Sequence, residues 1–189
     1  MSSDEIFPHI RTIHDLGETL AYEPDISQQL FAVRLGQWSI RFASRAVLLH
    51  RDGKHTSIAL QSIPHRGVTK LPGGGVKADE SLRDSLQREI REETGLAATK
   101  LEILGSVIEY RKDWKLVQIS NCFTGVVDSL EPQFEPTEPG SSVVWAESSA
   151  QALEMLRLAP GMEGNEYDRQ FATARDISVI EFLQKNNAI

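Results

Sequence analysis

The chain has 189 residues, 40% of them hydrophobic, which suits one domain with a real core and excludes a disordered polypeptide. Its formal net charge of −7 gives no support to a nucleic-acid groove or to binding at an anionic membrane surface. The N-terminus, MSSDEIFPHI, lacks a signal-peptide pattern, and no stretch approaches the roughly 18 apolar residues of a membrane span. We therefore expect a cytoplasmic protein with neither a membrane nor a nucleic-acid polymer as partner.

The first 40 residues mix polar and apolar side chains without a sustained period. We interpret residues 1–40 as an N-terminal arm of uncertain structure, with a helix around 26–34 and a first edge strand as its candidate elements. Residues 41–189 are then predicted to form the main domain.

Clear strand signals begin at Ala43. The segment SRAVLLHRDGKHTSIALQSI has two apolar runs around Asp52-Gly53, which predicts a β-hairpin. A short strand over 68–71 ends at Pro72, where a glycine-rich turn begins. Further strands are predicted over 101–110, 115–128 and 142–147, and the segment 129–141, with three prolines, is typical of an exposed loop.

Three helices are predicted among these strands. The first runs from about Glu80 to Thr94 and ends at Gly95, a natural C-terminal stop. A short helix over 149–158 and a longer amphipathic one from Tyr167 to Asn186 follow. The order of strands, helix, strands and helices indicates a mixed α+β or α/β sandwich without regular βαβ alternation. The terminal helix is either a capping helix or part of a homodimer contact.

The first helix carries glutamates beside its apolar stripe. At about 100° per residue, Glu93 falls about 20° from Leu82, and Glu89 lies about 20° to the other side. Glu92 lies about 80° from Leu82, whereas Arg88 falls on the ordinary solvated face. Charges at the margin of a core are costly unless they are paired or bind a metal, so a merely solvated acidic face does not explain this pattern.

The three glutamates stand at positions i, i+3 and i+4, so their side chains converge. Clustered carboxylates repel one another without a cation between them, and such oxygen ligands suit Mg²⁺ or Mn²⁺. The preceding glycines allow backbone groups to approach a ligand closely. The sequence has neither a P-loop motif nor HExxH. We therefore predict a divalent-metal site.

The spacing G-x5-E-x7-R-E-U-x-E-E-x-G-U, where U is a bulky aliphatic residue, is satisfied at every fixed position between Gly74 and Leu96. This segment resembles the signature box of the Nudix hydrolases. The resemblance implies a Nudix fold, an α/β/α sandwich around a mixed central sheet, with the N-terminal arm and the C-terminal helix outside the motif. The matching residues are Gly74, Glu80, Arg88, Glu89, Ile90, Glu92, Glu93, Gly95 and Leu96.

The resemblance also implies an activity and a site. Nudix hydrolases cleave nucleoside diphosphates linked to another moiety, with a divalent metal that is usually Mg²⁺, and Mn²⁺ is the expected substitute. Glu89, Glu92 and Glu93 match metal-ligand positions, and the carbonyl of Gly73 matches a backbone ligand. Two further matching positions, which support the ligands by hydrogen bonds, are Glu80 and Arg88.

Several residues outside the box are candidates for the same site. Many family members add an acidic residue from a downstream loop, and Glu138 is the candidate here, with Glu135 and Glu131 as rivals. The general base is then Glu92, Glu93 or the loop residue. The candidates for substrate binding are Arg66 and Lys70 for phosphate, and Tyr110, Trp114 and Phe123 for stacking on a base, although packing within the fold is the simpler role for the three aromatic residues.

We expect hydrolysis of the pyrophosphate bond of a small nucleotide-like substrate such as a nucleoside triphosphate, ADP-ribose or a nucleotide sugar. The alternative is a Nudix-fold sensor module that binds a nucleotide without turnover. The intact glutamates favour the enzyme. Isopentenyl diphosphate isomerase, which shares the fold, needs an active-site cysteine, and the position of Cys122 in a strand after the box argues against it.

Overall fold

The structure is a computed structural model that describes residues 9–14, 39–53, 55–159 and 166–189, the first of these ranges by its backbone. Its centre is an eight-stranded mixed sheet with the strand order β1-β6-β7-β2-β3-β4, in which β5 also pairs with β2 and β8 with β3. The strands are β1 (His9–His14), β2 (Ser39–Asp52), β3 (His55–Ile63), β4 (Val68–Lys70), β5 (Gly73–Gly75), β6 (Thr99–Arg111), β7 (Leu116–Val126) and β8 (Ser142–Ala146).

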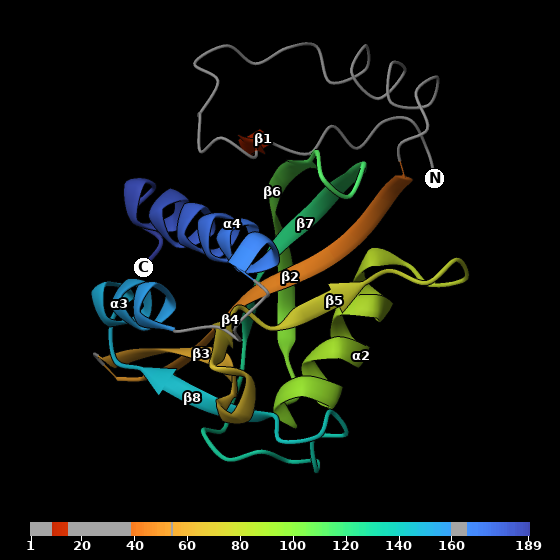
Figure 1. Ribbon diagram of the computed structural model, residues 1–189. Helices are drawn as coiled ribbons and strands as arrows, with labels where there is room; N and C mark the ends of the chain where they lie inside the picture. Colours follow the sequence, from red (N-terminus) through yellow and green to blue (C-terminus); the bar gives the residue numbers. More distant parts are fainter. Residues whose placement is uncertain (1–8, 15–38, 54, 160–165) are drawn as a thin grey trace.

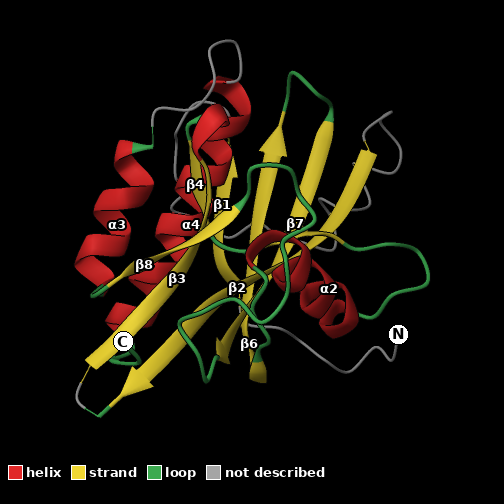
Figure 2. Ribbon diagram, turned by 90° about the horizontal axis from the view of Figure 1, so that it is seen from below, coloured by secondary structure: helices red, strands yellow, loops and turns green. Residues whose placement is uncertain are grey.

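Helices cover both faces of this sheet. Figure 1 shows α2 (Leu82–Thr94) on one side of the strands, and α3 (Ser149–Leu158) and α4 (Glu166–Lys185) on the other. Figure 2 shows the same layers from below, and a 3₁₀ turn, Pro64–Arg66, links β3 to β4. The predicted α/β/α sandwich with a mixed sheet is therefore confirmed.

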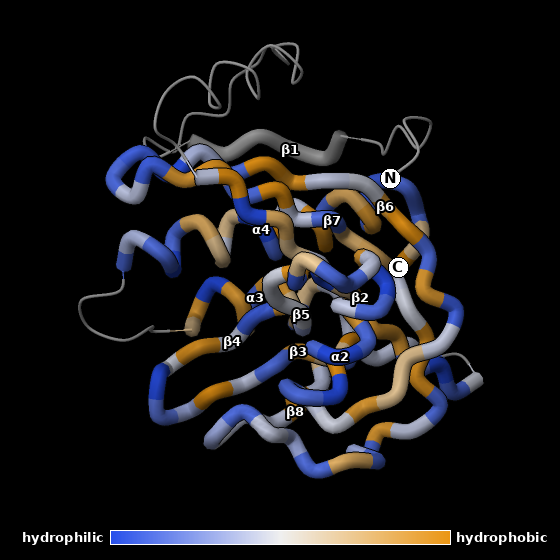
Figure 3. Tube along the Cα trace, turned by 90° about the vertical axis from the view of Figure 1, so that its right-hand side faces the viewer, coloured by the Kyte–Doolittle hydropathy of each residue, from blue (hydrophilic) through white to orange (hydrophobic). Residues whose placement is uncertain are grey.

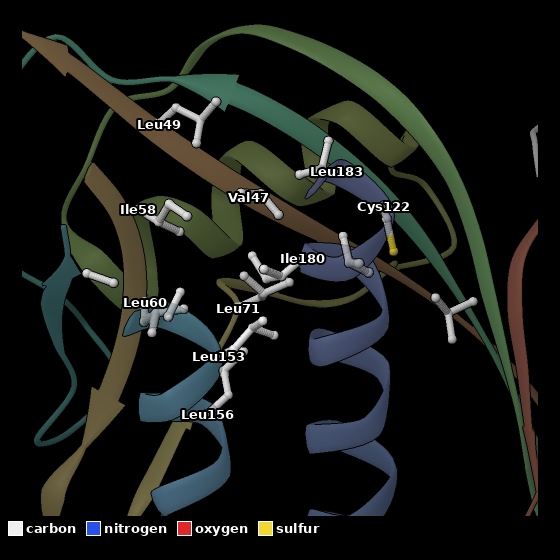
Figure 4. Packing of buried hydrophobic residues seen from close by; sticks show 14 of the residues in the cluster. Val47, Leu49, Ile58, Leu60, Leu71, Cys122, Leu153, Leu156, Ile180 and Leu183 are labelled. Carbon is white, nitrogen blue, oxygen red and sulfur yellow. The ribbon is translucent and has the colours of Figure 1, made fainter. Parts of the chain in front are cut away.

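Alternation along the central strands builds one apolar core on each face. Val47 and Leu49 of β2 belong to the core beneath α3 and α4, whereas Ala46 and Leu48 belong to the core beneath α2. This follows from the two-residue period of a strand, which points successive side chains to opposite faces. Figure 4 shows the first of these cores, in which Leu183 of α4 packs with strand residues.

The ends of α2 are set by the residues that flank it. Ser81 is the N-cap, and its hydroxyl accepts a hydrogen bond from the backbone N–H of Asp84 at 3.1 Å. Such a cap stabilises a helix by about 1 kcal/mol relative to alanine. Gly95 ends the helix in the left-handed region at φ +70°, as predicted. Ser81 and Gly95 therefore set the length of α2, and the hydroxyl of Ser85 joins the helix to β5 by donating to the carbonyl of Gly75 at 3.2 Å.

The strand predictions agree closely with the structure. The hairpin at Asp52-Gly53 joins antiparallel β2 and β3, and β6 and β7 form the second antiparallel pair. Within the N-terminal arm, β1 lies at one end of the sheet order and pairs in parallel with β6, as expected for an edge strand. The helix predicted around 26–34 lies outside the described residues, and the domain boundary at residue 41 stays a prediction. None of the helices in the described ranges has the length and apolar character needed to cross a bilayer.

Candidate active site

The glycine-rich turn forms strand β5, which pairs antiparallel with residues 43–45 of β2. Gly73 has φ +133°, and a Cβ there would overlap the carbonyl oxygen of Ser44. A Cβ on Gly74 would instead overlap the carboxylate of Glu89. Glycine is therefore required at the first position by the backbone conformation and at the second by the close approach of a box glutamate.

Glu93 is the buried member of the glutamate cluster, with its side chain only 5% exposed. Its Oε1 accepts a hydrogen bond from Lys70 Nζ at 2.9 Å, and its Oε2 accepts one from the N–H of Gly73 at 2.7 Å. Burial raises the pKa of Glu93, and the nearby charges of Lys70 and Arg45 oppose that rise. The helix-wheel prediction of a carboxylate within the buried stripe is confirmed.

Arg88 organises the remaining acidic side chains. Its guanidinium binds Glu80 with two hydrogen bonds, of 2.6 and 3.0 Å, and donates to Glu89 at 2.7 Å and to Glu92 at 3.0 Å. It also donates to the carbonyl of Gly75 at 3.1 Å. The hydrogen bond from Arg88 lowers the pKa of Glu80 to about 2. The supporting roles of Glu80 and Arg88 stay predictions. The helix-wheel placement of Arg88 on the solvated face was wrong, because its guanidinium turns back toward the glutamates.

The chemistry of the cluster fits a divalent cation. The donors are carboxylates and backbone carbonyls, and the missing Cβ of Gly74 makes the space in which the Glu89 carboxylate lies. In the described part of the chain, however, no three acidic, histidine or cysteine side chains gather closely enough to enclose an ion. Arg88 engages Glu89 and Glu92, and Lys70 engages Glu93. The metal-ligand roles therefore stay predictions. Figure 3 shows α2 as a largely hydrophilic helix that lies beside β5.

The loop over 129–141 folds onto the C-terminal end of α2. The backbone N–H groups of Thr137 and Glu138 donate to the carbonyl of Glu92, and the hydroxyl of Ser141 donates to the carbonyl of Glu93 at 2.6 Å. These contacts satisfy carbonyls that the last helical turn leaves without intrahelical partners. The loop therefore brings Glu138 close to the box.

Glu138 is fixed by side chains from β3 and the 3₁₀ turn. Gln61 donates to its Oε2 at 2.7 Å, and Arg66 lies 3.6 Å from its Oε1. The rivals Glu131 and Glu135 are exposed, whereas Glu138 is half-buried. Of the three candidates, Glu138 has the contacts expected of a site residue.

A pocket of about 180 Å³ lies beside this cluster. Lys70 and Glu138 line it together with Arg66, so three predicted site residues face one space. Its other wall is the first half of α4, which contributes Asp168 and Thr173. Lys70 both lines this pocket with Arg66 and forms an ion pair with Glu93, so it connects the pocket to the glutamate cluster.

The aromatic candidates lie elsewhere. Tyr110 packs on the sheet against residues such as Ile108 and Val117, and Phe123 is part of the core beneath α2. Trp114 lies with its ring centroid 5.3 Å from that of Tyr167 in α4. Phe123 is a core residue and not a stacking residue, and the substrate roles of Tyr110 and Trp114 stay predictions.

Sequence reasoning missed three buried charged residues near the site. Arg45 lies across from Gly73 in the β2–β5 pair, is 6% exposed, and its Nε and Nη1 have no hydrogen-bond partner among the described residues. Burial, and then the charge of Arg175, lowers the pKa of Arg45. Arg175 and Asp176 are also buried. The burial of Arg175 and Asp176 could have been predicted from helical spacing. They lie four residues before Val179 and Ile180, two buried apolar residues on the same side of α4.

Comparison with known proteins decides the family. A sequence model of the NUDIX domain matches residues 40–165, which is more than half of the chain. The chain belongs to the Nudix hydrolase family. Members of this family are pyrophosphohydrolases that act on nucleoside diphosphate derivatives, so the prediction of an enzyme of this class is confirmed.

Individual Nudix relatives resemble parts of the chain. The uncharacterized Nudix hydrolase YvcI of Bacillus subtilis is 32% identical over 115 residues, which are 60% of this chain and 70% of that protein. An ADP-ribose pyrophosphatase of Methanocaldococcus jannaschii is 36% identical over 31% of this chain and 34% of its own length. The CTP pyrophosphohydrolase of Escherichia coli is 42% identical over 32% of this chain and 46% of its own length. The chain thus spans less than half of these last two relatives.

Solved Nudix structures share the fold. The NUDIX domain of Shewanella oneidensis NrtR in complex with ADP ribose has a TM-score of 0.56 and 20% identity, over 87% of this chain and 99% of that one. A NUDIX hydrolase from Nitrosomonas europaea has a TM-score of 0.51 and 18% identity, over 73% of this chain and 92% of that one. At these identities the likeness supports the sandwich fold alone.

Proposed function

We propose that this Nudix hydrolase cleaves the pyrophosphate bond of a nucleoside triphosphate, ADP-ribose or a nucleotide sugar, and that it needs Mg²⁺ to do so. The observation that carries the proposal is the pairing of Gly73 and Gly74 with Glu93 and Glu89, which places box carboxylates directly against the glycine turn. Two relatives named as pyrophosphatases of ADP-ribose and CTP, and a structural neighbour bound to ADP ribose, support this class of substrate.

The cations around the turn explain how an acidic protein can take an anionic substrate. Lys70 and Arg66 line the pocket, and Arg45, which pairs with Gly73 along the backbone, has two side-chain N–H positions without a hydrogen-bond partner among the described residues. A phosphate oxygen is the kind of acceptor that such donors bind. These local charges offset the formal net charge of −7 at the place where the substrate has to approach.

The roles of the chain's own residues follow from their positions. Glu89, Glu92, Glu93 and the carbonyl of Gly73 would hold the metal, and Arg88 with Glu80 would keep two of these carboxylates in place. When bound, the metal ion supplies charge neutralisation at the phosphates and activation of the attacking water. Glu92, Glu93 or Glu138 would take the proton of that water.

The test is a phosphate-release screen over nucleoside triphosphates, ADP-ribose, nucleotide sugars and dinucleoside polyphosphates, with and without Mg²⁺. We expect metal-dependent turnover of at least one compound and a large loss in Glu92→Gln. The exposed Glu147→Gln is the matched control and should behave as wild type. Equal inactivity of wild type and Glu92→Gln, with nucleotide binding retained, would instead establish a sensor module.

A further inference from the structure

The C-terminal helix α4 lies beyond the matched family region but places two charged side chains in the interior. The match ends at residue 165, and α4 begins at Glu166. Arg175 and Asp176 are 2% and 0% exposed. The same helix buries Ile180 and Leu183 in the apolar core (Figure 4), where a further apolar pair would also fit its pattern. Because buried charges cost free energy unless they are fully paired, these two require a specific reason.

The Asp176 carboxylate contacts the backbone at the start of the glycine-rich turn. Its Oδ2 accepts a hydrogen bond from the N–H of Leu71 at 2.8 Å. Two residues later, the N–H of Gly73 donates to Oε2 of Glu93 at 2.7 Å. The residue between them is Pro72, which has no N–H and a fixed φ. One carboxylate from α4 and one from the Nudix box therefore hold the two ends of the same three-residue segment.

The Asp176 carboxylate is itself held in place. Arg175 donates from Nε to Asp176 Oδ1 at 2.7 Å, and from Nη1 to Glu109 Oε1 of β6 at 3.3 Å. Glu109 also binds Arg111, which forms an ion pair with Asp168 near the start of α4. These contacts tie α4 to β6 at two places along the helix and restrain the position of Asp176.

We propose that Asp176 is a positioning residue of the active site, which fixes the Leu71–Gly73 backbone in the conformation that Glu93 and the metal site require. This inference rests on the proposed function. The helix α4 then has two roles. It covers one face of the sheet, and through Asp176 it sets the backbone geometry of the glycine-rich turn that follows Leu71. Partners that orient metal ligands in this way typically account for about tenfold to a hundredfold in activity or metal affinity.

The test compares three variants of the full chain. Asp176→Ala removes both hydrogen bonds, Asp176→Asn keeps an acceptor for the N–H of Leu71, and Val179→Ala removes only apolar packing from the same helix. Each is measured for thermal stability, kcat, the Mg²⁺ concentration for half-maximal activity, and amide hydrogen exchange of Leu71 and Gly73 in the metal-free protein.

We expect Asp176→Ala to lower kcat or raise the Mg²⁺ requirement by about tenfold or more, and to accelerate exchange at Leu71 and Gly73. Asp176→Asn should show smaller changes than Asp176→Ala in the same direction. If the alanine variant does not fold, the comparison of Asp176→Asn with wild type and Val179→Ala tests the proposal. Val179→Ala should lower the melting temperature and leave the kinetics and the turn exchange unchanged. Wild-type kinetics and exchange in the Asp176 variants, or equal effects in Val179→Ala, would overturn the proposal. A wild-type protein without hydrolytic activity would refute the proposed function, whereas the exchange measurement would still decide the role of Asp176.

Discussion

Arg88 and Glu80 form a two-point ion pair, with Nε–Oε1 and Nη2–Oε2 distances of 2.6 and 3.0 Å, eight residues apart in the sequence. The same guanidinium binds Glu89 and Glu92, so one side chain links the start of the box to its glutamates. A planar fork is needed for this arrangement, because a lysine ammonium cannot make paired parallel hydrogen bonds. The box arginine therefore acts as a spacer between carboxylates that would otherwise repel one another.

We predict that Arg88→Lys lowers turnover by about tenfold to a hundredfold, although it keeps the charge. The reason is the loss of the fork that orients Glu89 and Glu92. Steady-state kinetics at saturating Mg²⁺ measures the effect, and the exposed Arg157→Lys on α3 is the control that should keep wild-type activity. Full activity in Arg88→Lys would show that the fork geometry is not needed.

The Glu80 carboxyl predicts a pH dependence of stability. Its pKa is lowered to about 2 in the folded protein, chiefly by the hydrogen bond from Arg88. The pKa of a glutamate in an unfolded chain is about 4.3. The stabilisation is therefore fully present above about pH 4.3 and is lost as the pH falls toward about 2. The difference in unfolding free energy between wild type and Glu80→Gln, measured in urea, should shrink over that range. A difference for Glu80→Gln that stays constant over this range would argue against the ion pair.

The sequence was sufficient for those parts of the site that depend on local spacing. Glu89, Glu92 and Glu93 could be placed relative to the core because their positions on one helix follow from its period. Ser81 and Gly95 limit that helix by rules that act over a few residues. The Asp52-Gly53 turn likewise predicted the β2–β3 hairpin.

The parts that sequence could not supply depend on contacts between distant segments. Leu71 and Asp176 are 105 positions apart, and their hydrogen bond exists only because α4 lies against the sheet beside the glycine turn. The place of the buried Arg45 beside Gly73 likewise follows from the pairing of β2 with β5. Arg88 was misplaced on the helix wheel because a long side chain can turn back from the direction of its Cβ.

Substitutions of the three glutamates in the loop 129–141 can identify the one that acts in catalysis. We predict that Glu138→Gln lowers kcat by at least about tenfold, because Glu138 is held beside Lys70 in the pocket and can act on the reacting water. Glu131→Gln and Glu135→Gln, at exposed positions of the same loop, are matched controls and should retain wild-type kcat. A larger loss in either control than in Glu138→Gln would transfer the role to that residue.

Cys122 is predicted to be inert in the folded protein. It is fully buried in β7, and burial raises its pKa to about 12, so the reactive thiolate is scarce. Alkylation by iodoacetamide at about pH 8 should be slower by about a hundredfold or more than in the urea-unfolded chain. Equally fast labelling of the native protein would show an accessible thiol and would restore a cysteine-dependent chemistry as a candidate.

The most direct measurement is turnover of the best screened substrate as a function of Mg²⁺ concentration, for wild type and Glu93→Gln. Wild type should be inactive in EDTA and recover with added Mg²⁺, whereas Glu93→Gln should lose at least about a hundredfold at every concentration. Glutamine keeps an acceptor for the N–H of Gly73, so the turn should stay in place. Metal-independent turnover, or wild-type activity in Glu93→Gln, would contradict the assignment of the box glutamates as the metal site of a pyrophosphohydrolase.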